Sequence, residues 1–231
     1  MTHDPASLKR AAAARALDFV EDGMKLGLGT GSTAEAFLDV LAASGRKITG
    51  TATSERTALK AKALGIPLGE LDALAPLDLT IDGADEADRD LNLIKGGGGA
   101  LLREKIVAAS SKRMIVIADD TKLVDRLGNF PLPVEIIPFG HGTTIARIRK
   151  IIAALGYGDV AITPRMNGGA IFRTDSNNLI VDCAFGAIED APALARALCG
   201  IPGVVDHGLF IGLATTLVIA GAGGVRVIEK S

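Results

Sequence analysis

The feature that most constrains the fold is a regular alternation of short apolar runs and helical stretches in the first half of the chain. The expected strands are residues 24–29, 47–53, 77–81 and 113–118, and the expected helices are residues 8–20, 34–43, 55–64 and 100–109. When a helix lies between two successive strands, it forms the crossover connection that joins parallel strands of one sheet. The pattern therefore predicts a parallel sheet that helices cover on both faces.

A second type of pattern begins at Phe130, where the segment FPLPVEIIPF contains three prolines. The elements expected after it are strand 134–137, helix 143–155, strands 160–163, 170–173 and 179–184, helix 191–198 and a strand from residue 204. This order resembles a split βαββαβ motif. Residues 209–219 and 225–228 are expected to return as strands to the first domain. We therefore predict a Rossmann-like, mostly parallel α/β domain (residues 1–130 plus 205–231) and a smaller α+β, ferredoxin-like domain (residues 131–204).

Composition narrows the class of protein. The 231 residues carry a formal charge of −2 and are 48% hydrophobic, which suits a folded core and argues against nucleic acid as a partner. Every apolar run is interrupted by Gly, Pro or a charge, so no membrane span is expected. The N-terminus also lacks the order of a signal peptide.

Cysteine and histidine give little support for a metal or redox site. Cys183 and Cys199 form no CxxC pair, which is typical of two buried thiols in a reducing cytoplasm, with a disulfide as the alternative. His3, His141 and His207 are far apart in the sequence, so a histidine-based metal site is not expected.

The first candidate loop is the glycine-rich segment GTGST, residues 29–33. A glycine turn at a helix N-terminus presents free N–H groups to an anion, and Ser32 and Thr33 add hydroxyl donors. A Walker A motif is excluded because no Lys-Ser/Thr pair follows the glycines. A dinucleotide site is disfavoured because the second expected strand does not end in an acid that could bind a ribose. The nearest acid is Glu55. A small phosphate monoester is the better interpretation, with a plain tight turn as the alternative.

The second loop, DGADE at residues 82–86, follows a buried strand. Gly83 and Ala84 leave space for a ligand, and Asp82 and Asp85 can accept hydrogen bonds from vicinal sugar hydroxyls. Two neighbouring carboxylates also raise one pKa, which allows proton exchange. Glu86 and the nearby Asp88 are expected to cap a helix or face solvent.

The third loop is KGGGGALLREK, residues 95–105. Four consecutive glycines let the backbone approach a substrate closely, and Lys95 can stabilise an oxyanion. A helix that begins near Ala100 places Glu104 on one face with Leu101 and Ala108, where desolvation raises its pKa and makes it a stronger base. The alternative is an exposed Glu104 in a mixed-charge cluster with its two basic neighbours.

Together these loops make the chain closely resemble the ribose-5-phosphate isomerase family, type A. The matching segments are GTGST (29–33), TSERT (53–57), DGADE (82–86), KGGGGALLREK (95–105), ADDTK (118–122), FPLPVEIIPF (130–139) and IPGVVDHGLF (201–210). The resemblance implies cytoplasmic enzymes of the pentose phosphate pathway, in its non-oxidative branch. They are homodimers or sometimes homotetramers that act on a small sugar phosphate, and they need no metal and no cofactor.

The resemblance also implies roles for single residues. Glu104 matches the general base, Asp82 and Asp85 match acids that contact the sugar and assist ring opening, and Lys95 matches the lysine near the reacting oxygens. The implied substrate-binding residues are Thr30, Gly31, Ser32, Thr33, Asp82, Gly83, Ala84, Asp85, Lys95, Gly96, Gly97, Gly98, Lys122 and Lys9. Of these, the loop at residues 30–33, Lys122 and the N-terminal Lys9 would hold the phosphate.

The expected reaction interconverts D-ribose 5-phosphate and D-ribulose 5-phosphate through an enediolate intermediate. A metal-assisted hydride shift is disfavoured but is not excluded by the acids present. Other activities on a related fold, such as a lactonase or an amino-sugar deaminase, are the enzymatic alternatives. The alternative without catalysis is a sugar-phosphate-sensing domain of a transcription regulator, for which no segment before Met24 is long enough to hold a helix-turn-helix.

Overall fold

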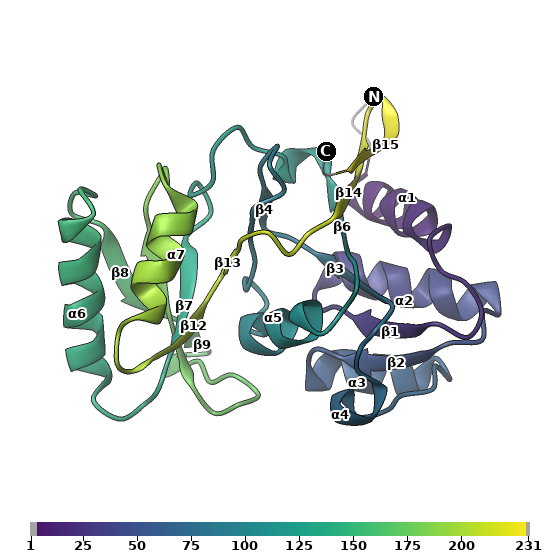
Figure 1. The fold of residues 1–231 in the computed structure, drawn as a ribbon, viewed down its shortest axis with the longest axis horizontal. Coiled ribbons are helices and arrows are strands. Elements are labelled where there is room, and N and C mark those ends of the chain that lie inside the picture. Colours follow the sequence, from purple (N-terminus) through teal and green to yellow (C-terminus); the bar gives the residue numbers. More distant parts are fainter. Residues whose placement is uncertain (1–3, 230–231) are drawn as a thin grey trace.

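The structure, a computed structural model, describes residues 4–229, and a six-stranded sheet forms the centre of its larger part, on the right in Figure 1. The strands are β1 (Lys25–Leu28), β2 (Thr49–Ala52), β3 (Leu79–Gly83), β6 (Met114–Asp119), β14 (Thr216–Gly221) and β15 (Gly224–Glu229). Their order is β15-β14-β6-β3-β1-β2, and only the β14–β15 pair is antiparallel. The predicted mostly parallel sheet is therefore confirmed.

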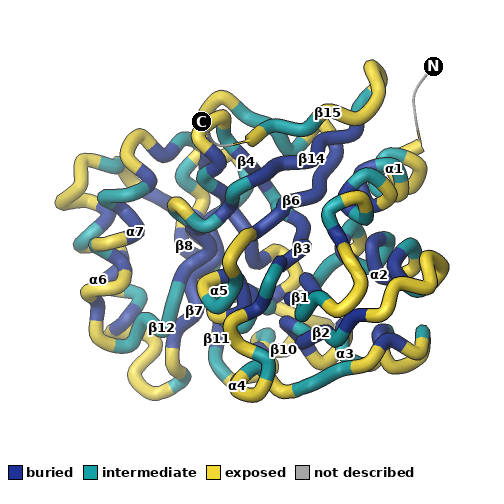
Figure 2. Tube along the Cα trace, turned by 45° about the vertical axis from the view of Figure 1, so that its right-hand side comes forward, coloured by how far each residue is buried: buried dark blue, intermediate teal, exposed yellow. Residues whose placement is uncertain are grey.

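Helices cover both faces of this sheet. The helices α1 (Pro5–Leu17), α2 (Ser32–Ser44) and α3 (Glu55–Ala63) share one apolar cluster with the strand residues Leu26, Ile81 and Ile117. Helix α5 (Leu101–Ala109) packs on the opposite face, where Met114 and Val116 contribute to a second cluster. Figure 2 shows the central strands as the buried part of this layer. The short α4 (Leu71–Leu74) lies in the connection before β3.

A second, four-stranded sheet has the order β12-β7-β11-β8, and all its pairs are antiparallel. Its strands are β7 (Leu132–Ile136), β8 (Ala161–Pro164), β11 (Leu179–Ala184) and β12 (Val204–His207). Helices α6 (His141–Ala154) and α7 (Ala191–Cys199) share its apolar cluster. In chain order this is a βαββαβ unit with its fourth strand beside its first, as the smaller ferredoxin-like part requires.

Some expected strands are wrong in detail. Residues 209–219 do not form one strand, because the chain turns at Gly212 (φ +70°). The first part is β13 (Leu209–Phe210), in a separate three-stranded sheet with β5 (Leu93–Ile94) and β4 (Glu86–Ala87), and the second part is β14. These two-residue strands are too short for a periodic pattern to reveal.

The expected strand 170–173 is also different. Only β10 (Ala170–Ile171) forms, and it pairs with β9 (Met166–Asn167) outside the four-stranded sheet. Two glycines with positive φ, Gly168 and Gly169, close this hairpin in the two-residue turn that such strands favour. The hairpin is part of an arm, residues 165–178, that connects β8 to β11.

The strand order locates a ligand site. Strand β2 lies on one side of β1, and β3 lies on the other, so the chain reverses its direction across the sheet between β1 and β3. Open α/β sheets bind ligands beyond the carboxyl ends of the strands at such a point. The loops after β1, β3 and β6 therefore meet there, and the last of them is the 3-10 turn η1 (Asp120–Lys122). Within residues 4–229, no helix combines the length and hydropathy that crossing a membrane requires.

Candidate active site

A cleft of about 270 Å³ opens at this point of the sheet. Its lining residues are Pro5, Lys9, Thr30, Gly31, Ser32, Thr33, Gly83, Ala84, Asp85, Lys95, Gly96, Gly97, Gly98, Glu104, Asp119, Thr121 and Lys122. The structure thus brings together all the predicted site residues, except that Asp82 is fully buried and lies beneath Lys95. Sequence reasoning missed Pro5, Asp119 and Thr121, although the last two lie in the segment ADDTK that already pointed to Lys122.

A buried lysine joins two acids at the bottom of the cleft. The Lys95 ammonium lies 2.9 Å from Asp82 Oδ2 and 3.4 Å from Glu104 Oε2, and it donates a hydrogen bond of 2.7 Å to the Gly83 carbonyl. The three charged residues are each at most 3% exposed. Because isolated buried charges are costly, this close pairing is what allows a cation and two acids to share a dry site.

Hydrogen bonds favour the ionised form of Asp82. Its Oδ1 accepts from the backbone N–H groups of Thr30 (3.1 Å) and Gly83 (2.7 Å), which are the partners that a buried acid needs. Burial raises the pKa of Asp82, while Lys95 and these two donors oppose that effect. Burial alone would lower the pKa of Lys95, but Asp82 and Glu104 outweigh it and raise the pKa, so the amine stays charged.

Glu104 is also buried with a raised pKa, but it lacks the backbone hydrogen bonds that Asp82 accepts. It lies in the first turn of α5, is 3% exposed and shares a buried face with Leu101 and Ala108, so an exposed mixed-charge cluster is wrong. Among the described residues its Oε2 has no hydrogen-bond partner. Burial raises the pKa of Glu104 to about 8, assisted by Asp82 and Asp85 and opposed by Lys95. A carboxylate with this pKa takes up a proton near neutral pH, as a general base must.

The four glycines form a turn between Lys95 and α5. Gly96 has a φ of +108°, which a residue with a side chain rarely adopts. At Gly97 a Cβ would lie only 2.6 Å from Asp85 Oδ1, and its N–H donates to Asp85 Oδ2 at 2.8 Å. A Cβ at Gly98 would meet only Thr30 Cγ2, at 3.6 Å. The turn therefore holds Asp85 in place and keeps the cleft open beside Gly98.

The other end of the cleft is built for an anion. Helix α2 begins there after Gly31 and has no side-chain hydrogen bond at its N-cap, so its first N–H groups and the positive end of its dipole face the cleft. Lys9 from α1 donates to Ser32 Oγ at 2.9 Å, and Lys122 lines the cleft from η1. Two lysines and a helix N-terminus at one end of a cleft are groups that can bind a phosphate.

Thr30 contributes differently from its neighbours. Its hydroxyl lies 2.8 Å from Thr53 Oγ1, 2.8 Å from Ser54 Oγ and 3.0 Å from Thr57 Oγ1, in a buried cluster behind the loop. Its methyl group faces the glycine turn near Gly98. The segment TSERT, to which the sequence assigned no role, therefore supports the loop from behind.

Two acids near Asp85 have structural partners. Glu86 is 3% exposed, and its carboxylate accepts from the N–H groups of Gly128 (2.7 Å) and Phe130 (2.6 Å). The expectation that it caps a helix or faces solvent is wrong, because the fold brings a distant loop over it. Asp88 accepts from the N–H groups of Asp90 and Asn92, so it stabilises the turn between β4 and β5 rather than a helix.

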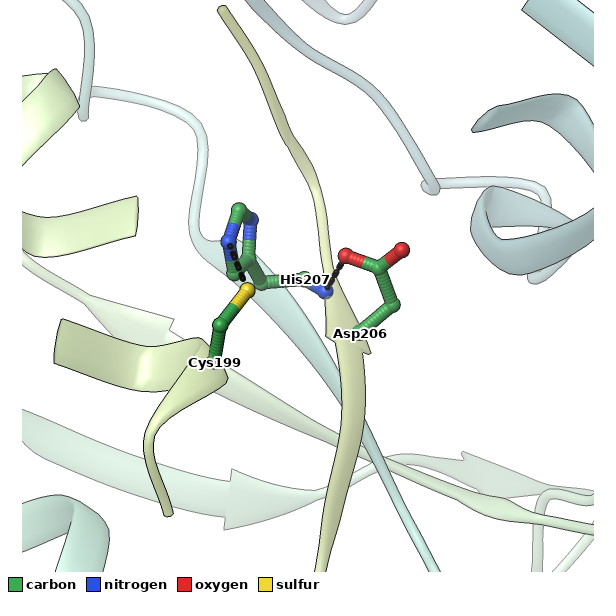
Figure 3. Close-up of side chains that lie close together, drawn as sticks. All are labelled: Cys199, Asp206 and His207. Carbon is green, nitrogen blue, oxygen red and sulfur yellow. Dashed lines mark hydrogen bonds between the residues drawn. The ribbon is translucent and has the colours of Figure 1, made fainter. Parts of the chain in front are cut away.

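A group with metal-ligating side chains lies outside the cleft (Figure 3). The side-chain ligand atoms of Cys199, Asp206 and His207 lie within 4.8 Å of one another. Both ring nitrogens of His207 already have partners, however: Leu209 N–H donates to Nδ1 at 3.2 Å, and Nε2 lies 3.0 Å from the Ala195 carbonyl. Burial, and then the nearby Lys105, lower the pKa of His207 to about 4. We therefore regard this group as structural.

Within the described residues, neither Cys183 nor His141 belongs to a further group of metal-ligating side chains. Cys183 is buried, but Cys199 is exposed, so the expectation of two buried thiols is wrong for Cys199. The reason is its position as the last residue of α7, at a helix end. His141 is the first residue of α6 and is exposed, and His3 lies outside the described residues.

Comparison with known proteins decides the family. A family model described as ribose 5-phosphate isomerase A (phosphoriboisomerase A) matches residues 49–224. The chain belongs to this family. The ribose-5-phosphate isomerase A of Bradyrhizobium diazoefficiens is 58% identical over 230 residues, which cover 96% of this chain and 95% of that protein. The isomerase of Rhodopseudomonas palustris strain CGA009 is 56% identical over 232 residues, 99% of this chain and 100% of that protein.

Solved structures of ribose-5-phosphate isomerases have the same fold. The Plasmodium falciparum structure superposes with a TM-score of 0.91 at 38% identity, covering 98% of this chain and 99% of the other. A further structure, a D-ribose-5-phosphate isomerase in complex with phospho-erythronic acid, has a TM-score of 0.90 at 36% identity and covers 98% and 100%. The predicted fold class and the predicted family are both confirmed, and the chain is an isomerase.

Proposed function

We propose that the chain interconverts D-ribose 5-phosphate and D-ribulose 5-phosphate through an enediolate, with Glu104 as the single base. The observation that carries this proposal is the buried Glu104 carboxyl, whose pKa is raised to about 8, beside the Lys95 ammonium at 3.4 Å. A base and a fixed positive charge at one end of a cleft, with an anion site at the other, suit proton transfer on a short sugar phosphate.

The phosphate anchors the substrate away from the reacting carbons. The α2 N-terminus, Lys9 and Lys122 bind it, and this remote binding energy orients the sugar along the cleft. Asp85 and the backbone of the glycine turn then lie beside the sugar hydroxyls. Asp82 and Asp85 assist ring opening before the chemical step. A relative with 36% identity was solved with phospho-erythronic acid, a phosphorylated sugar acid, which supports such a binding mode.

In the chemical step, Glu104 removes the proton from C2 of the open-chain aldose. The electron pair forms the C1–C2 double bond, and the carbonyl oxygen O1 takes the negative charge beside the Lys95 ammonium. Glu104 then returns its proton to C1, while the O2 hydroxyl proton passes to O1 and leaves the ketone at C2. One base over one face of the intermediate performs both transfers.

The positive charge in this mechanism comes from the protein itself. Lys95 contacts both Asp82 and Glu104, the two acids that would otherwise be candidate ligands for a cation. We therefore propose an isomerase that needs neither metal nor cofactor, in contrast to a metal-assisted hydride shift. Turnover of ribose 5-phosphate should be unchanged by a chelator, and loss of turnover that an added divalent cation restores would contradict this.

The substitution Glu104→Gln tests the assignment of the base. It keeps the shape of the side chain but cannot accept the C2 proton, so turnover should fall by about 10²–10⁴-fold. The measurement is ribulose 5-phosphate formation under saturating ribose 5-phosphate, with the exposed Glu55→Gln as the control. Near-normal turnover in Glu104→Gln would remove Glu104 from its role.

Solvent isotope exchange tests the enediolate. In deuterated water the product should carry deuterium at C1, because Glu104 exchanges its proton before returning it. A product without label would favour a hydride shift or a proton fully shielded from solvent. Ammonia release from an amino-sugar phosphate would point instead to a deaminase.

The remaining proposals rest on the family resemblance. We propose a cytoplasmic homodimer, with a homotetramer as the alternative, that serves the non-oxidative branch of the pentose phosphate pathway. Sedimentation equilibrium distinguishes the two assemblies. We also propose two domains, residues 1–130 plus 205–231 and residues 131–204. Because β12 continues to His207 within the four-stranded sheet, the second boundary is better placed just after that residue.

A further inference from the structure

An arginine of the smaller domain supports the glycine turn from outside the cleft. Arg165 begins the arm after β8, and its Nη1 donates to the carbonyls of Gly96 (2.7 Å) and Gly97 (3.2 Å). The rest of its guanidinium binds Asp182 through two hydrogen bonds, from Nε at 2.9 Å and from Nη2 at 2.5 Å. Asp182 belongs to β11, so a rigid strand fixes the direction of the arginine.

The same arm contacts two more parts of the larger domain. The Phe172 ring lies over Gly99, where a Cβ would come within 2.4 Å of its Cζ atom. Asp175 accepts from the backbone N–H of Glu55 at 2.8 Å, at the start of α3, and its backbone carbonyl accepts from Arg103 of α5 at 3.0 Å. The arm therefore binds the glycine turn, the helix that carries Glu104 and the helix behind Thr30.

We propose that Arg165, held by Asp182, is a positioning residue for the isomerisation, through which the smaller domain fixes the shape of the active-site cleft. This inference rests on the proposed function of the cleft. Arg165 is not among the residues that line the cleft, and its side-chain hydrogen bonds go to Asp182 and to the Gly96 and Gly97 carbonyls, so it acts through the backbone that it binds.

The physical reason is the freedom of four consecutive glycines. A glycine run samples many backbone conformations unless its polar groups are held. Here the Gly97 N–H is held from one side by Asp85, and the Gly96 and Gly97 carbonyls are held from the other side by Arg165. Without Arg165 the Gly97 carbonyl loses this hydrogen bond and the Gly96 carbonyl keeps the Gly99 N–H at 3.0 Å, so the turn that holds Asp85 becomes looser. The phosphate end of the cleft does not depend on this contact.

The test compares Arg165→Ala with Arg173→Ala. Arg173 lies on the same arm but is exposed, and its hydrogen bonds go only to Asn177 within its own turn. We expect Arg165→Ala to lower kcat by about tenfold or more, the size of losing a charged hydrogen bond. It should weaken competitive inhibition by phospho-erythronic acid to a similar extent. Inhibition by inorganic phosphate should change by less than about twofold, and Arg173→Ala should match the unchanged protein in all three assays.

Two results would overturn the inference. One is a kcat for Arg165→Ala equal to that of Arg173→Ala. The other is a loss of inhibition by inorganic phosphate in Arg165→Ala as large as its loss of inhibition by phospho-erythronic acid, which would indicate general damage to the fold. If Arg165→Ala does not fold, Arg165→Lys decides, because lysine keeps the charge but cannot bind Asp182 and two carbonyls together. It should lower kcat with an unchanged melting temperature, and a normal kcat would again overturn the inference. Glu104→Gln in the same assay shows whether the inference about Arg165 or the proposed function of the cleft has failed. If the proposed function is wrong, Glu104→Gln stays active; if only the role of Arg165 is wrong, Glu104→Gln is inactive.

Discussion

At the scale of single residues, unequal hydrogen bonding distinguishes the two acids beside Lys95. Asp82 and Glu104 are both buried beside Lys95, and one ammonium cannot balance two carboxylates. Asp82 has two backbone donors in addition to the lysine, whereas Glu104 Oε2 has no hydrogen bond within the described residues. Burial raises the pKa of both acids, but the two backbone donors oppose this effect only at Asp82, which favours Glu104 as the proposed base.

This balance predicts the pH dependence of the reaction. Because the base must be ionised and the pKa of Glu104 is raised to about 8, kcat/KM should rise with pH through that value in the free enzyme. Asp85 contributes to the raised pKa, so Asp85→Asn should move the rise to lower pH whatever it does to the maximal rate. The exposed Asp90→Asn is the control. A profile that stays flat from about pH 6 to 9, or a rise moved upward in Asp85→Asn, would contradict this origin of the pKa.

At the scale of secondary-structure elements, the ends of helices and strands build the proposed phosphate site. Helix α2 starts at the cleft with its N–H groups uncapped by a side chain, and α1 lies against α2 so that Lys9 reaches Ser32. Strand β6 ends in the turn η1 and brings Lys122 to the same place. Three elements from different parts of the sequence thus contribute to the proposed phosphate site.

Removing either lysine should affect binding more than turnover. We expect Lys9→Ala and Lys122→Ala each to raise the KM for ribose 5-phosphate by about tenfold, with kcat changed much less, because the phosphate is remote from the reacting carbons. Arg10→Ala, next to Lys9 on α1 but exposed, is the control. Initial-rate kinetics measure both constants, and an unchanged KM would exclude that lysine from the phosphate site.

At the scale of the whole molecule, the helix that carries the base is held between the two sheets. Helix α5 packs on the large sheet, and Lys105, next to Glu104, donates to Asp206 and to the His207 carbonyl of β12 at 2.5 and 2.6 Å. Burial of Glu104 in this position favours activity but opposes folding when the group is charged. Catalysis and stability therefore make opposite demands on one residue.

This conflict predicts a pH-dependent stability. The folded pKa of Glu104, about 8, lies above its ordinary value of 4.5, so the folded state binds more protons between these values and its stability falls as pH rises. Glu104→Gln removes this loss. It should therefore melt at a higher temperature than the unchanged protein near pH 8, by an amount that shrinks toward pH 5. Calorimetry against Glu55→Gln measures the difference, and an equal difference at both pH values would contradict a buried, proton-binding Glu104.

Much of the fold was predictable because its signals are local. The helices and the strands of the large sheet follow from apolar periodicity, which reflects burial within each segment. Residues 209–219 were predicted as one strand because they are continuously apolar. The chain divides at Gly212 because its two parts pair with strands of two different sheets, which are distant in sequence. Likewise, nothing near Glu86 indicates that the distant Gly128 and Phe130 bury it.

The sequence by itself determined the chemical groups of the site and the strand ends that carry them. It left Glu104 open between a buried face of α5 and an exposed mixed-charge cluster, and the structure shows the buried face. Only the tertiary structure decided how these groups divide their tasks. The order of the strands brings Asp82, Lys95 and Glu104 within contact of one another, and the arm of the second domain places Arg165 behind the glycines. Such contacts join residues that are distant in sequence, so they depend on how the elements pack in space and cannot be predicted from a local pattern of residues.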